Sequence, residues 1–97
     1  MYLHNEKDGG FFDLDYLPFY TIEDGLITQR GKEDEHFYSV YGQATMGQSI
    51  RLAWFKTRDI AESLLNFIVL VIREQDYSSV IHISKEGSIW RVGKDAP

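Results

Sequence analysis

The chain has 97 residues and a net charge of −5, and it contains no cysteine. This length fits one domain with its own hydrophobic core, and the lack of cysteine excludes disulfides and thiolate metal sites. The acidic balance argues against nucleic-acid binding, because such binding depends mainly on basic residues that neutralise phosphates.

We expect neither an export signal nor a membrane segment at the start of this sequence. The sequence MYLHNEKDGG has no basic region followed by an apolar core, and no apolar run approaches the ~20 residues that a membrane helix needs. We expect a cytoplasmic protein with a single domain over residues 1–97. Within it, residues 1–18 are expected to be irregular, with a turn at Asp8-Gly9-Gly10, and residues 19–97 to form an α+β body.

Acidic residues are concentrated in the first third of the chain. Residues 1–35 contain nine acidic and three basic residues, whereas residues 36–97 contain six acidic and seven basic residues. A charged segment of this kind is usually solvated surface, but it also suits a basic protein partner. The acidic N-terminal segment is therefore a candidate region for binding a protein.

A first hairpin is predicted after Pro18. Residues 19–22 and 26–29 are β-prone runs that flank Glu23-Asp24-Gly25. A three-residue loop with glycine in the left-handed position is typical of a hairpin with a bulge.

Two further strands are predicted at residues 36–42 and 50–55, with a turn at residues 43–48. Alternation places Tyr41 on one face of the first of these strands and Tyr38 on the other. Because both faces carry aromatic residues, we expect this strand to be covered on both sides.

Residues 57–75 contain no glycine or proline and show the clearest helical pattern. At about 100° per residue they form one broad apolar arc. Its members are Ile60, Ala61, Leu64, Leu65, Phe67, Ile68, Val71 and Ile72. We expect an amphipathic helix capped by the hydroxyl of Thr57. Val69 lies at the edge of this arc and Leu70 lies outside it, so both are predicted to mediate self-association.

The same stretch also admits a second interpretation. Residues 67–72 form an apolar run rich in β-branched residues, which is typical of a buried strand. The helix would then end near Leu65, with Asn66 as a left-handed terminator. We favour the long helix, because the apolar arc continues in phase through Ile72.

A second hairpin is predicted around Lys85-Glu86-Gly87, with strands at residues 79–84 and 88–92. Ile81 and Ile83 are expected to face the core and His82 the solvent. In the last strand either Ile89 and Arg91 or Trp90 and Val92 face the core, and residues 93–97 form a polar tail. The element order predicts an α+β fold, in which an antiparallel sheet of about four to six strands carries the helix on one face.

No pattern in the sequence indicates catalysis or cofactor binding. His4, His36 and His82 lack the spacing of metal ligands, and the acids beside His36 are typical of a solvated loop. No serine lies in a nucleophile motif, and no glycine-rich phosphate loop is present. We therefore predict no catalytic residue, no metal ion and no cofactor.

Aromatic residues on the predicted strands form the candidate binding surface. They are Tyr38, Tyr41, Trp54 and Trp90. Such a face can stack on a small ligand or on single-stranded nucleic acid, but it lacks the interleaved Lys and Arg of nucleic-acid-binding sheets. More often it is covered by another subunit. We expect a non-catalytic interaction or accessory module that self-associates as a homodimer or larger oligomer, with ligand or single-strand binding as the alternative.

Residues 37–92 resemble small uncharacterised bacterial domains built as hairpin, helix and hairpin. The resemblance depends on Phe55, Thr57, Ala61 and Glu62 at the start of the helix and on the Lys85-Glu86-Gly87 turn. The helix is about one turn longer here. The chain is also similar to orphan products of bacterial mobile elements such as integron cassettes and phages. The resemblance implies the strand–helix order and carries no functional residue.

Overall fold

A computed structural model describes residues 1–92, so the polar tail expected at residues 93–97 lies outside the described part. These residues form strands, one α-helix and one short 3-10 helix. In chain order they are β1 (Tyr2–Asn5), β2 (Gly10–Asp13), η1 (Leu14–Tyr16), β3 (Phe19–Ile27), β4 (Glu35–Gln43), β5 (Ser49–Phe55), α1 (Arg58–Glu74), β6 (Val80–Ile83) and β7 (Ile89–Val92).

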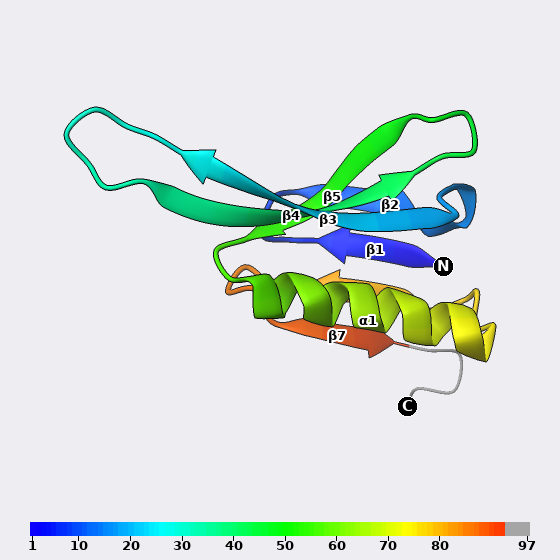
Figure 1. The fold of residues 1–97 in the computed structure, drawn as a ribbon. Coiled ribbons are helices and arrows are strands. Elements are labelled where there is room, and N and C mark those ends of the chain that lie inside the picture. The colour runs from blue at the N-terminus through cyan, green and yellow to red at the C-terminus, as the bar shows by residue number, and fades with distance from the viewer. Residues whose placement is uncertain (93–97) are drawn as a thin grey trace.

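The strands divide into two sheets that share the helix. Sheet A has four strands in the order β2-β1-β6-β7, and sheet B has three in the order β3-β4-β5. Neighbouring strands are antiparallel except β1 and β6, which are parallel. Helix α1 contacts all three strands of sheet B and β7 of sheet A, and Figure 1 shows it below sheet B. The predicted α+β class is confirmed, with the strands in two sheets instead of one.

Helix α1 matches the predicted long helix. Its buried side chains recur every three or four residues, as packing along one stripe requires. They are Ala61, Leu64, Ile68 and Val71. The alternative strand at residues 67–72 is therefore wrong. Thr57 does occupy the N-cap position, but its side chain makes no capping hydrogen bond, so that expectation is also wrong. Within residues 1–92 no helix has the length and hydrophobicity that crossing a membrane requires.

The core lies where α1 meets the inner faces of both sheets. Sheet A contributes Leu3, Ile81 and Ile83, which are fully buried, and sheet B contributes Val40 and Phe55. Each such aliphatic or aromatic side chain stabilises the fold by about 1.5–3 kcal/mol through burial. The inward orientation predicted for the two isoleucines is confirmed.

Residues 1–18 were expected to be irregular, and this expectation is wrong. These residues form β1, β2 and η1, and β1 lies inside sheet A with a partner on each side. Leu3 lies opposite both Phe12 in β2 and Ile81 in β6. The turn between β1 and β2 is confirmed, and Gly9 has a φ of 75° there. Strand β1 was not predicted, because its partner β6 is distant in the sequence.

The hairpin predicted at residues 19–29 is wrong. Strand β3 continues through this region and pairs with β4 along its whole length. Gly25 lies opposite Phe37, and a Cβ atom at Gly25 would come within 2.8 Å of three carbons of the Phe37 ring. The glycine therefore makes room for an aromatic ring within a strand. The chain reverses later, around Gly31, whose φ is 81°.

The two predicted middle strands are present as β4 and β5, but their pairing is irregular. Val40 lies opposite Ala53, whereas the next residue, Tyr41, lies opposite Arg51. Leu52 is thus the extra residue of a β-bulge. This bulge faces the N-terminal segment, where it becomes part of the junction between the sheets.

The C-terminal hairpin also matches the prediction. Strands β6 and β7 are antiparallel, and Gly87 in the turn between them has a φ of 89°. Of the two orientations left open for β7, the structure has Ile89 packed against the core and Trp90 exposed.

Candidate functional site

The outer face of sheet A, which points away from the core, carries aligned aromatic and aliphatic side chains. Because side chains alternate along a strand, the neighbours of the buried Leu3, Ile81 and Ile83 point outward. The strand register arranges them in two rows across β2, β1, β6 and β7. The first row is Phe11, His4, His82 and Trp90, and the second is Asp13, Tyr2, Val80 and Val92. These eight residues are called the outer face below.

The first row is a continuous series of ring contacts. The ring centres of Phe11 and His4 are 5.9 Å apart, and those of His4 and His82 are 5.5 Å apart. His82 stacks on Trp90 at 5.1 Å, and Tyr2 stacks on Phe11 at 5.4 Å. These distances lie in the favourable range for aromatic pairs. The rings therefore hold one another in place and present a preformed surface.

This surface is accessible and almost uncharged. Phe11 is 63% exposed and Trp90 is 41% exposed. Asp13 is the single acidic residue among the eight, and its carboxylate accepts a hydrogen bond from the Asp15 N–H at 3.0 Å. Contiguous apolar patches that contain aromatic residues and few charges are typical of protein interaction sites.

The structure does not bring the four aromatic residues expected to bind onto one face. Trp90 lies on the outer face of sheet A. Tyr41 and Trp54 lie on sheet B, on the side away from α1, whereas Tyr38 is on the opposite side and packs against the core. Trp54 makes an edge contact with Phe37, with ring centres 6.4 Å apart.

The helix residues expected to mediate self-association are partly accessible. Leu70 is 44% exposed and Val69 is half-buried. Leu70 lines a shallow hollow of about 250 Å³ with Ser63, Asn66 and Phe67. This hollow is on α1 and shares no residue with the outer face of sheet A, so it is a second, separate candidate contact.

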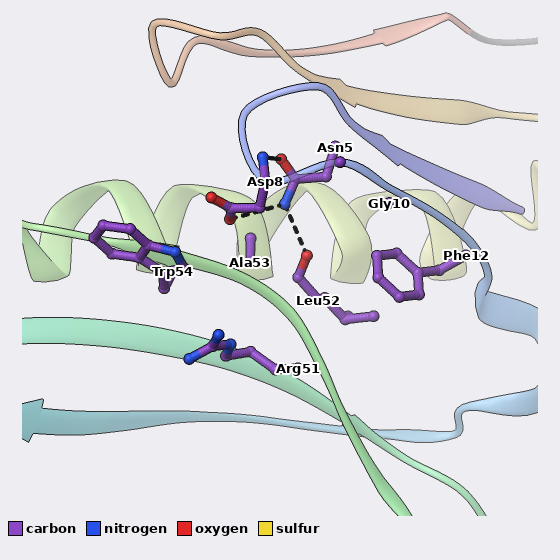
Figure 2. A pocket seen from close by; sticks show the side chains of 9 residues that line it. Asn5, Asp8, Gly10, Phe12, Arg51, Leu52, Ala53 and Trp54 are labelled. Carbon is purple, nitrogen blue, oxygen red and sulfur yellow. Dashed lines mark hydrogen bonds between the residues drawn. The ribbon is translucent and has the colours of Figure 1, made fainter.

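A small cavity marks the junction of the two sheets (Figure 2). It has a volume of about 180 Å³ and lies between the β1–β2 loop and β5. The Asn5 amide donates to the Leu52 carbonyl at 2.9 Å and to the Asp8 carboxylate at 3.2 Å, and the Asp8 N–H donates to Asn5 Oδ1 at 3.1 Å. These hydrogen bonds connect the β1–β2 loop to β5, and we interpret this region as a structural contact between the two sheets. We call this contact the joint.

Lys7 strengthens the same joint. Its Nζ donates to the Trp54 carbonyl at 2.7 Å and lies 3.7 Å from the centre of the Trp54 ring. A cation over an aromatic ring stabilises a contact by about 0.5–1 kcal/mol at exposed sites. Lys7 therefore fixes the β1–β2 loop against β5.

The histidine pair on the outer face lacks further metal ligands. Among residues 1–92 no group of three or more His, Asp or Glu side chains is arranged to hold a metal ion. His4 and His82 lie opposite each other in β1 and β6, and their observed contacts are with rings. We therefore treat both as members of the aromatic row.

No family model, curated protein or solved structure matches the chain.

The outward orientation predicted for His82 is confirmed, but the row of rings to which it belongs was not predicted. The missing members, Phe11 and His4, lie in the two strands that were expected to be irregular. Burial alternates along Tyr2–Asn5, but apolar and polar residues do not, because the polar Asn5 is buried as Leu3 is. The sequence of these four residues therefore contains no alternation that would predict a strand.

Proposed function

We propose that the chain is a non-catalytic interaction module that self-associates through the outer face of sheet A. The observation that carries this proposal is the row of four rings that crosses every strand of the sheet, with Phe11 and Trp90 exposed at its two ends. Two sheets pack face to face at about 10 Å by interlocking such side chains. Aromatic residues are also enriched, and charged residues depleted, at the centres of protein interfaces.

The charge distribution supports a second copy as the partner. Each chain carries a net charge of −5, so two copies repel each other over much of their surfaces. Asp13 is the single acidic residue of the outer face, and it lies in the edge strand β2. Docking through this face brings the fewest like charges together.

The same face is poorly suited to single-stranded nucleic acid. Proteins of that kind place Lys and Arg beside the stacking rings to neutralise the backbone. None of the eight residues of the outer face is lysine or arginine. This feature favours a protein surface over a nucleic acid as the occupant.

The test is the solution mass of the parent chain and of Trp90→Glu, measured by light scattering at a low and a high concentration. We expect the parent chain to dimerise and Trp90→Glu to remain monomeric, because docking would bury an unpaired carboxylate. Tyr16→Glu is the matched control, since Tyr16 is 75% exposed and lies outside the outer face. A parent chain that is monomeric at both concentrations contradicts the proposal.

A third variant separates the two candidate contacts. Leu70→Glu places the same charge on α1 at a residue that is 44% exposed. If Leu70→Glu dissociates the dimer and Trp90→Glu does not, the contact is on the helix and the proposal for sheet A is wrong. Circular dichroism of each variant confirms that it is folded before its mass is interpreted.

A further inference from the structure

Strand β3 leaves one side of its backbone open. It is at the edge of sheet B, and among residues 1–92 it pairs only with β4. Its nine residues are well above the usual strand length of about five or six. Alternate N–H and C=O groups therefore point away from the sheet, and an edge of this length can template pairing with another chain.

A groove runs between this edge and helix α1. It has a volume of about 550 Å³. Its strand side is formed by Tyr20, Thr21 and Ile22, and its helix side by Arg58, Glu62, Leu65 and Asn66. Ile22 and Leu65 are half-buried and give the groove an apolar part. A strand added along β3 would place every second side chain against this part.

The charge along the edge is acidic. Glu23 and Asp24 lie at the middle of β3, and neither forms an ion pair within residues 1–92. Arg58 is the only basic residue among those that line the groove, and its Nε donates to Glu62 at 3.0 Å. Neither acid lines the groove, and their side chains point to opposite faces of β3, with Asp24 on the same face as Ile22 and Glu23 on the other. A basic side chain of an added strand that lies opposite either acid meets a carboxylate, whereas an acidic side chain there meets repulsion.

We infer that this groove binds an extended basic segment of another protein, which pairs with β3 as an added strand. Main-chain hydrogen bonds to β3 would provide affinity, and an apolar side chain between Ile22 and Leu65 would provide specificity. Lysine or arginine residues of the segment would pair with Glu23 and Asp24. The inference is independent of self-association through sheet A.

A second copy of β3 is a poor occupant of the same edge. In antiparallel pairing about the centre of the strand, Glu23 of one chain would face the acidic centre of the other. Like charges directly opposite each other destabilise strand pairing. The two acids thus disfavour self-pairing and favour a basic partner.

The test uses an acetylated and amidated seven-residue peptide with two adjacent lysines near its centre and valines on either side, so that one lysine lies on each face of the added strand. Its affinity is measured by fluorescence anisotropy, and its position by hydrogen exchange of the β3 amides. We expect binding with new protection in Phe19–Ile27. The same peptide with a fully N-methylated backbone keeps its charge but cannot pair with a strand, so we expect it not to bind. Equal binding of both peptides, or no binding of the first, overturns the inference.

A charge reversal tests the recognition. The double variant Glu23→Lys, Asp24→Lys should bind the peptide about tenfold more weakly, because it removes both partners of the lysines. The matched control Glu6→Lys, Glu86→Lys changes the net charge equally at exposed residues outside β3 and α1, and should bind as the parent chain does. An equal loss of affinity in both double variants would show that binding depends only on the net charge of the protein. This result would overturn the inference.

Discussion

The side-chain amide of Asn5 in β1 donates a hydrogen bond to the main-chain carbonyl of Leu52 in β5, 2.9 Å away, and so joins sheet A to sheet B (Figure 2). Both residues are buried, at 1% exposed each. Leu52 is the bulge residue of β5, so its backbone departs from regular pairing with β4. The amide thus supplies a hydrogen-bond partner for the main-chain carbonyl of a buried residue.

Replacing Asn5 by alanine should lower the free energy of unfolding by about 1–3 kcal/mol, because it leaves the buried Leu52 carbonyl without a donor. Ser39→Ala is a matched control. Ser39 is 2% exposed, and within residues 1–92 its hydroxyl has no hydrogen-bond partner. Its removal should change the unfolding free energy by less than about 0.5 kcal/mol or raise it. Urea unfolding measures both, and equal losses would contradict the role given to Asn5.

Gly25 and Phe37 should show strong coupling in a double-mutant cycle. Gly25→Ala inserts a methyl group where the Phe37 ring lies, and we expect a loss of about 1–3 kcal/mol from overpacking. In a Phe37→Ala background the ring is absent, so the same change should cost nothing or stabilise the strand. Chemical denaturation of the four proteins measures the coupling. A cost that is the same in both backgrounds would show that the ring is not the reason for the glycine.

Leu64 should be among the most sensitive positions of α1. It is 0% exposed, and Leu64→Ala should cost about 2–5 kcal/mol because it leaves a cavity between the helix and the sheets. Leu70→Ala makes the same change at a residue that is 44% exposed, and should cost less than about 1 kcal/mol in the monomer. Thermal unfolding at low concentration compares them. Similar losses would mean that the helix is rotated relative to the core.

Tyr20 should make stability depend on alkaline pH. Its hydroxyl donates to the Leu14 carbonyl at 3.1 Å, and burial, followed by the charge of Asp15, raises its pKa from 10.0 to about 12. Between these two values the unfolded chain loses the Tyr20 proton while the folded chain keeps it. The free energy of unfolding therefore falls as pH rises through this window.

Tyr20→Phe should remove this contribution, so that its stability falls less steeply than that of the parent chain across the window. Tyr16→Phe, at a residue that is 75% exposed, should keep the parent slope. Urea unfolding below and within the window provides the comparison. Identical slopes for the parent chain and Tyr20→Phe would contradict the raised pKa.

Elements defined by their own periodicity could be predicted from the sequence, and elements defined by distant partners could not. Helix α1 follows from an apolar arc that depends only on spacing, and the β6–β7 hairpin follows from alternation around Gly87. Gly25 was misread because the ring that requires it comes from another strand. Strand β1 was missed because its parallel partner β6 lies near the other end of the chain.

The candidate site shows the same division. His82 and Trp90 could each be placed on a strand, but the row depends on the register of four strands, and two of these were not predicted. The groove beside β3 was not predicted, for a related reason. A turn placed at Glu23-Asp24-Gly25 cuts the long edge strand in two, so no continuous edge remains to be recognised.

The parallel pairing of β1 with β6 also sets the order in which the outer face is assembled. Strands β1 and β2 of sheet A are synthesised well before their neighbours β6 and β7, because the whole of sheet B and helix α1 lie between them in the chain. A chain interrupted before Val80 would contain Phe11 and His4 without His82 and Trp90, and thus half of the ring row. The proposed docking through this face would then select chains that already contain β6 and β7 over chains that end before them.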